Sequence, residues 1–156
     1  MEVSLEKATL ADAEVLWEMQ KRSFAALLAR YQDYETSPAT ETLARIEERL
    51  RRPERHYYFI LCEGEKAGAI CVVDPYRVPG AKRISPLFIL PEYQNRGLAQ
   101  AAIREVECLH GAHNWSLDTI LQEPGNCHLY EKMGYRRVGE PRPVNERLTL
   151  IDYEKP

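Results

Sequence analysis

Short stretches in which apolar and polar residues alternate, or in which apolar residues run together, recur along the whole chain. EVSLEKA and WSLDTIL alternate, whereas HYYFILCE and KAGAICVVD are apolar runs joined by a turn at Gly64 and Glu65. Patterns of this length, rich in aromatic and β-branched residues, are typical of β-strands. They predict strands at residues 2–8, 56–63, 66–74, 83–90, 115–121, 135–139 and 147–153, the last two antiparallel across a loop at 141–146.

The segments between these strands favour helices. Thr9 is a good N-terminal cap with Asp12 in the capping-box position, and apolar side chains then line one side of a helix at residues 10–24. Residues 24–34 are predicted either to continue this helix or to form a second short one. Further helices are predicted at residues 39–52, 100–107 and 126–133. This order of helices and strands predicts an α+β domain built on one mixed sheet.

Composition and charge narrow the class of protein. A chain of 156 residues can bury one sizeable core, so we expect a single domain over residues 1–156. The net charge of −3 disfavours nucleic acid as a partner, and no apolar run is long enough for a membrane span or a signal peptide. The four cysteines are widely spaced, which favours buried free thiols in a reducing cytoplasm over disulfides or a metal site.

The stretch from residue 83 to 107 carries the clearest chemical signal. An apolar strand ends before Pro91, a short loop contains Arg96 and Gly97, and a helix follows from Ala99 onward. The first N–H groups of a helix have no internal partner and favour negative charge, and glycine lets the backbone approach a ligand closely. Arg96 adds a positive charge beside them. We interpret this loop as a cradle for a pyrophosphate.

The loop resembles the acyl-CoA loop of the GCN5-related N-acetyltransferase (GNAT) superfamily, whose pattern is Q/R-x-x-G-x-G/A. Gln94, Gly97 and Ala99 occupy the three defining positions, and LYEKMGY at residues 129–135 is a second stretch similar to the superfamily. The resemblance implies the acyl-CoA N-acyltransferase fold, a single mixed, mostly antiparallel sheet flanked by helices, whose central strands splay apart. It also implies acetyl-CoA as co-substrate and no metal.

The resemblance further implies how the coenzyme binds. The strand edge at Phe88, Ile89 and Leu90 would hold the pantetheine chain through main-chain groups, and an N–H near Ile89 would polarise the thioester carbonyl. Asn126 would either hydrogen-bond to the pantetheine chain or cap its own helix. The expected coenzyme contacts are Phe88, Ile89, Leu90, Gln94, Asn95, Arg96, Gly97, Leu98, Ala99, Asn126 and Tyr130.

Tyr130 matches the tyrosine that serves as general acid in many members of the superfamily. A phenol with a pKa of about 10 is protonated at neutral pH and can give its proton to a thiolate. The alternative is a helix tyrosine that packs against the sheet. The motif does not fix a general base, for which Glu35, Glu123 and Ser85 through a chain of waters are candidates. An amine can also lose its proton to bulk water.

The acceptor would bind beside the variable helical region. Tyr31, Tyr34 and Glu35 lie in a loop rich in aromatic residues, where an acidic side chain could attract a cationic amine. Ser85 and Arg83 begin the central strand and could face the same pocket. The alternatives are that Glu35 is a solvated loop residue and that Arg83 only flanks the strand.

These inferences predict an N-acetyltransferase that moves the acetyl group of acetyl-CoA to a primary amine of a small molecule, by direct attack in a ternary complex. One alternative is an acyl-CoA sensor that binds without turnover. Another is an enzyme that acetylates a protein N-terminus or lysine. Two copies of the chain could also pair as a homodimer through edge strands.

Overall fold

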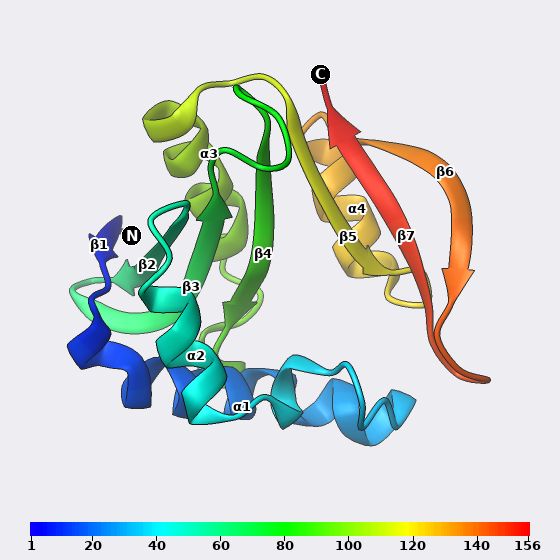
Figure 1. The fold of residues 1–156 in the computed structure, drawn as a ribbon, viewed down its shortest axis with the longest axis horizontal. Coiled ribbons are helices and arrows are strands. Elements are labelled where there is room, and N and C mark those ends of the chain that lie inside the picture. Colours follow the sequence, from blue (N-terminus) through cyan, green and yellow to red (C-terminus); the bar gives the residue numbers. More distant parts are fainter.

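The computed structural model describes residues 1–156, and its centre is one sheet of seven strands (Figure 1). The strands are β1 Val3–Lys7, β2 Arg55–Cys62, β3 Glu65–Val73, β4 Lys82–Ile89, β5 Trp115–Ile120, β6 Arg136–Pro143 and β7 Thr149–Lys155. They lie in the order β1-β2-β3-β4-β5-β7-β6. Every neighbouring pair is antiparallel except β4 and β5, so the predicted α+β fold with a mixed, mostly antiparallel sheet is confirmed.

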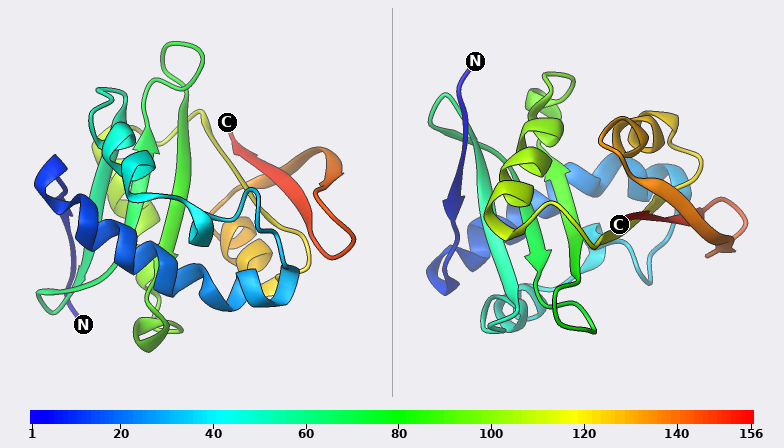
Figure 2. Two further views of the ribbon diagram at one scale, coloured as in Figure 1. Left: turned by 60° about the horizontal axis from the view of Figure 1, so that its bottom comes forward. Right: turned by 90° about the horizontal axis from the view of Figure 1, so that it is seen from above.

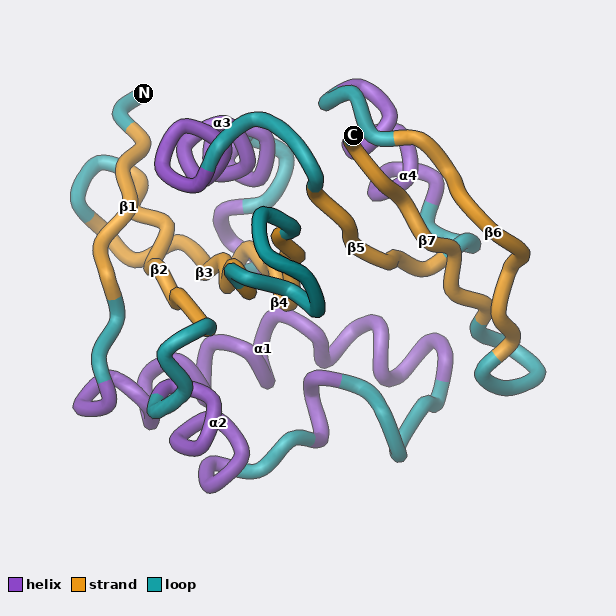
Figure 3. Tube along the Cα trace, turned by 45° about the horizontal axis from the view of Figure 1, so that its top comes forward, coloured by secondary structure: helices purple, strands orange, loops and turns teal.

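Four helices cover the two faces of this sheet: α1 Ala13–Tyr31, α2 Leu43–Leu50, α3 Leu98–His110 and α4 Pro124–Lys132. The long helix α1 runs beneath the sheet until its end lies beside α4 (Figure 2). Helices α1 and α2 lie on one face, and α3 and α4 lie on the other (Figure 3). Each face has its own apolar cluster, and each leucine or isoleucine fully buried there contributes about 1.5–3 kcal/mol.

The helical region between β1 and β2 differs from the prediction. The segment from residue 24 continues the preceding helix as far as Tyr31, which is the first of the two interpretations left open, because its alanines and leucines favour a continuous helix. A 3-10 turn at Leu10–Asp12 precedes α1, and Gln32 ends it with a left-handed φ of 54°. The helix expected at residues 39–52 is shorter, because Thr42 caps α2 by accepting from the N–H of Arg45 at 3.2 Å.

Strands β4 and β5 pair at one end only. Lys82 lies opposite Trp115 and Arg83 opposite Ser116, after which the two strands diverge (Figure 1). On its other side, β4 has a bulge in which Ser85 and the following proline face a single residue of β3. The expected splay of the central strands is confirmed. The bulge accommodates Pro86, which cannot donate a hydrogen bond to β3.

Gly68 of β3 lies where the backbone of β4 comes closest. A Cβ built on Gly68 would lie 2.2 Å from the carbonyl oxygen of Phe88, so no other residue fits without moving β4. Gly68 therefore allows β4 to lie close to β3, next to the site described below.

Three of the four cysteines are buried as predicted, namely Cys62, Cys71 and Cys127, whereas Cys108 is exposed. All four are free thiols. None of the helices combines the length and the apolar character that a bilayer span requires.

Candidate active site

The loop between β4 and α3 exposes a row of backbone donors. After a 3-10 turn at Pro91–Tyr93, the backbone takes left-handed φ values of 64° at Asn95 and 77° at Gly97. The N–H groups from Asn95 to Gln100 donate to no acceptor within the protein. Unpaired amides beside a helix N-terminus are groups that favour a bound anion.

Two side chains of the loop are used within the protein. The amide of Gln94 donates to the carbonyl of Ile89 at 3.2 Å and so ties the loop to the end of β4. The guanidinium of Arg96 donates to the carbonyl of Glu92 at 3.1 Å and lies over the ring of Tyr93. Arg96 is therefore held against Glu92 and Tyr93 in this structure, and its contact with a coenzyme stays a prediction.

A cavity of about 470 Å³ extends from this loop along β4 to α4, and we call it the loop cavity. Leu90 and Arg96 do not line it. The expected coenzyme contacts that do line it are Phe88, Ile89, Gln94, Asn95, Gly97, Leu98, Ala99, Asn126 and Tyr130.

The backbone of β4 turns alternate residues toward this cavity. The N–H of Leu90 donates to Ala67 of β3 at 2.8 Å, so the main-chain groups of Leu90 and Phe88 face β3. By the same alternation, those of Ile89 and Leu87 face the widening gap toward β5. The expectation that Phe88 and Leu90 present main-chain groups to a ligand is corrected, and Leu87 takes their place beside Ile89.

A second cavity, of about 410 Å³, lies where β4 and β5 diverge, and we call it the splay cavity. Its walls come from helices α1, α2 and α4, from the segment after α1, and from β4, β5 and β7. The residues that line both cavities are Phe24, Leu27, Leu87, Asn126 and Tyr130. The two cavities therefore meet between α1 and α4.

Tyr130 of α4 stands at this junction. Tyr130 is 8% exposed, and its ring packs edge-on against the ring of Tyr135, with the two ring centroids 6.1 Å apart. Its hydroxyl has no hydrogen-bond partner in the protein and is not fully enclosed, so it is reachable from the cavities. Burial raises the pKa of Tyr130 well above its ordinary value, which keeps the phenol protonated at neutral pH.

Asn126 does not cap α4. The helix begins at Pro124, the capping position is Glu123, and no side chain caps it by a hydrogen bond. Asn126 lies inside the first turn and lines both cavities, with no hydrogen bond from its side chain to the protein. Of the two interpretations left open by the sequence, helix capping is excluded by this geometry.

Glu123 is held by two partners from the end of α1. Its carboxylate accepts a hydrogen bond from the hydroxyl of Tyr31 and forms an ion pair with Arg30 at 2.6 Å. Burial, followed by this hydrogen bond, raises the pKa of Tyr31. Tyr31 is buried in the wall of the splay cavity, and Glu123 lines the loop cavity.

Of the remaining residues predicted to bind the acceptor amine, only some line a cavity. Ser85 lines the splay cavity. Arg83 lines neither cavity and pairs with Asp118 of β5 at 3.1 Å, which matches the flanking role left open for it. Tyr34 is 65% exposed and Glu35 is also exposed, and neither lines a cavity, so the expectation that they form the acceptor wall is corrected.

Asp33, which the sequence analysis missed, lies in the cavity wall instead. It is 8% exposed, lines the splay cavity, and accepts a hydrogen bond from the N–H of Thr36 at 3.0 Å. The spacing of an aspartate and a threonine three residues later is a signal for such a turn, and it could have singled out this residue.

The candidate site thus consists of a row of unpaired amides and two cavities that meet at one buried phenol. Residues 15–135 match the model of the Acetyltransferase (GNAT) family, and the chain belongs to this family. The protein is thus an acyltransferase, as its sequence predicted. No curated protein sequence matches the chain.

Solved structures share the fold at low sequence identity. An acetyltransferase from Thermus thermophilus aligns with a TM-score of 0.74 at 20% identity, over 97% of this chain and 96% of its own. A spermidine N-acetyltransferase from Vibrio cholerae, in complex with CoA and spermine, aligns with a TM-score of 0.76 at 15% identity, over 97% and 93%. The PaiA N-acetyltransferase from Thermoplasma acidophilum, in complex with coenzyme A, gives 0.68 at 15% identity over 100% of both chains.

Proposed function

We propose that the protein transfers the acetyl group of acetyl-CoA to a primary amine of a small molecule, by direct attack within a ternary complex. The observation that carries the proposal is the meeting of the loop cavity and the splay cavity at Tyr130. The coenzyme would fill the first and the amine the second, so that the reacting atoms meet beside the phenol. The structural neighbour that was solved with CoA and spermine supports an amine acceptor.

The chain fits a coenzyme pyrophosphate at the loop. The amides from Asn95 to Gln100 lack acceptors in the protein, and a negatively charged diphosphate would supply them. A Cβ built on Gly97 meets no atom within 4 Å, so the space beside the loop is open to a ligand. Asn126 has a free side-chain amide at the junction for the amide groups of the pantetheine chain.

The chain also supplies two groups near the transferred carbonyl. Acetyl-CoA, when bound, supplies an activated thioester for attack by the amine. The main-chain N–H of Ile89 faces the gap beside β4 and would donate to the carbonyl oxygen as negative charge develops there. The hydroxyl of Tyr130 would give its proton to the departing thiolate and regain one, through water, from the nitrogen that has attacked the carbonyl.

The acceptor must lose a proton before it attacks. Glu123 is occupied by Tyr31 and Arg30, and Glu35 lies outside both cavities. We therefore assign the removal of this proton to water in the splay cavity. Under this assignment, activity rises with pH as more of the free amine becomes neutral.

The proposal is tested by thermal shift and by thiol release. Acetyl-CoA should raise the melting temperature, because a ligand that binds only the folded state stabilises it. Replacing Gly97 by glutamate should abolish this shift, since a carboxylate would stand against the diphosphate. Free thiol should then appear on addition of small primary amines.

Other results of these two assays would support one of the alternative functions or refute the coenzyme site. A thermal shift with no thiol release across an amine panel would indicate a sensor. Thiol release with peptides but not with small amines would indicate a protein acetyltransferase. Absence of any shift with the intact protein would refute the assignment of the coenzyme site.

A further inference from the structure

The splay cavity has an uneven charge distribution. Its charged lining residues are Asp33, Glu41, Arg49 and Asp118, so carboxylates outnumber cations. The rest of the wall is largely apolar, with leucines such as Leu28, Leu117 and Leu148. A ligand that enters this cavity therefore meets an apolar surface and a small number of charges.

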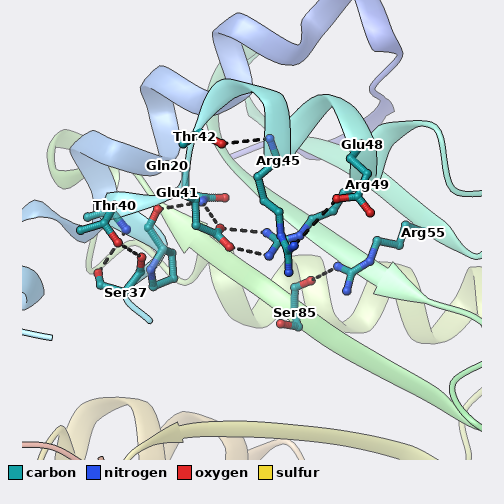
Figure 4. Close-up of polar contacts among 12 residues, drawn as sticks. Gln20, Ser37, Thr40, Glu41, Thr42, Arg45, Glu48, Arg49, Arg55 and Ser85 are labelled. Atoms are coloured by element: carbon teal, nitrogen blue, oxygen red, sulfur yellow. Dashed lines mark hydrogen bonds and ion pairs between the residues drawn. The ribbon is translucent and has the colours of Figure 1, made fainter. Parts of the chain in front are cut away.

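Two of the three carboxylates are neutralised within the protein. Glu41 forms an ion pair with Arg49, whose Nη1 lies 2.8 Å from its Oε1, and also accepts from Gln20 at 2.7 Å (Figure 4). Asp118 pairs with Arg83 and Arg142, each at 3.1 Å. Arg49 is likewise used by its pair with Glu41, so the wall offers no free guanidinium to an anionic acceptor.

Asp33 has no such partner. Asp33 is 8% exposed, and its carboxylate accepts hydrogen bonds only from the N–H and the hydroxyl of Thr36. No lysine, arginine or histidine nitrogen lies within 4.0 Å of it, as the ion pairs of the protein show. A buried carboxylate without a counter-ion is unfavourable, and a ligand cation in the cavity would relieve that cost.

Thr119 of β5 adds a second polar group to the same wall. It is 8% exposed and lines the splay cavity, yet its hydroxyl has no hydrogen-bond partner in the protein. The hydroxyl of Thr119 is not fully buried, so a ligand can reach it. A hydroxyl can accept from an ammonium group as well as donate.

We propose that Asp33 binds a second cationic group of the acceptor, and that the acceptor is therefore a dibasic amine. One nitrogen is acetylated beside Tyr130, and the other stays protonated and pairs with Asp33. The carbon chain between them lies along the apolar wall. This inference rests on the proposed function for the identity of the reaction, but the binding of the cation at Asp33 can be measured without turnover.

The test compares straight-chain α,ω-diamines with monoamines of the same length. For the wild-type protein we expect kcat/KM to be at least about tenfold higher for the best diamine, which corresponds to one hydrogen-bonded charge. Asp33→Asn should remove this preference, because it should raise KM much more for the diamine than for the monoamine. Glu14→Gln, which removes an exposed carboxylate of α1 far from either cavity wall, should keep the preference.

Calorimetry separates this inference from the proposed function. Titration of diamine into the CoA-saturated protein should give binding that Asp33→Asn weakens about tenfold or more and Glu14→Gln leaves unchanged. If no amine is acetylated, the proposed function fails, and this titration still decides the role of Asp33.

Two results would overturn the inference: equal kcat/KM for diamines and monoamines with the wild type, or equal losses for both in Asp33→Asn. Asparagine keeps an acceptor for the N–H of Thr36, so the turn should persist, and melting temperature checks this. If the variant does not fold, the wild-type ratio of diamine to monoamine decides.

Discussion

The hydroxyl of Tyr31 donates a hydrogen bond to the carboxylate of Glu123, although 92 residues separate them in the chain. The bond joins the C-terminal end of α1 to the start of α4, and these two elements frame the junction of the loop cavity and the splay cavity. Since Arg30 pairs with the same carboxylate, two consecutive residues of α1 hold α4 in position.

Replacing Tyr31 by phenylalanine removes this connection without creating a large void. Glu123 keeps its pair with Arg30, so we expect a loss of about 1–2 kcal/mol, toward the low end for hydrogen bonds to charged groups. The melting temperature should fall by about 3–6 °C for a chain of this size. Tyr34→Phe is the matched control, because Tyr34 is 65% exposed, and its melting temperature should not change. Equal melting curves for both variants would contradict the connection.

A second prediction concerns Gly97. Alanine at its φ of 77° introduces strain of about 1 kcal/mol and shifts the amides beside it. We expect the dissociation constant of acetyl-CoA, measured by calorimetry, to rise at least about tenfold, the equivalent of one hydrogen bond to a charged group.

Gly64→Ala provides the control for this change. Gly64 has a φ of 81° and equally open space around its Cβ position, but it lies in the turn between β2 and β3. The two variants should lose similar stability, and only Gly97→Ala should lose affinity. If affinity falls equally in both, the effect is global and the cradle is not the cause.

The loop at Gly97 could be found from the sequence because its chemistry is local. A strand, a glycine and a helix N-terminus follow each other in the chain, and helix geometry leaves the amides of the first helical turn unpaired. The sequence did not reveal that Arg96 turns back to the carbonyl of Glu92, since that orientation depends on the fold of the loop.

The acceptor wall was harder to predict, and the reason lies at Gln32. There the backbone becomes left-handed, so the helical periodicity of α1 stops and no longer tells which side chains face inward. Asp33 turns toward the splay cavity, whereas Tyr34 and Glu35 turn to solvent. Similarly, the main-chain groups of Leu87 and Ile89 face the gap because those of the alternate residues pair with β3. Which residues pair with β3 depends on the tertiary structure and cannot be deduced from the sequence of β4.

A third prediction addresses Tyr130. Tyr130→Phe keeps the ring packed against Tyr135 but removes the proposed proton donor, so kcat should fall about 100-fold or more. The dissociation constant of acetyl-CoA should change by less than about twofold, because the hydroxyl acts on the departing thiolate. Tyr135→Phe loses the hydrogen bond to Glu107 and should lower stability without lowering kcat. An unchanged kcat in Tyr130→Phe would leave this tyrosine with a packing role only.

The last prediction concerns pH and His56 of β2. Burial is the main reason that the pKa of His56 is lowered, and the charges of Lys7 and His110 lower it further, against a smaller opposite effect of Asp74. The folded protein holds the ring neutral, with its Nδ1 3.0 Å from the Nζ of Lys7. The unfolded chain takes up a proton at the ordinary pKa of about 6.5.

On acidification the unfolded state therefore binds this proton before the folded state does. The contribution of His56 to stability is greatest above about pH 6.5 and falls as the pH drops through that value, until the lower folded pKa is reached. Urea unfolding at about pH 7.5 and about pH 5.5 should show a smaller loss in His56→Gln than in the wild type. His113→Gln, at an exposed histidine, should lose as much as the wild type. Equal losses in all three proteins would show that other groups cause the acid sensitivity, since His56 would then bind its proton equally in both states.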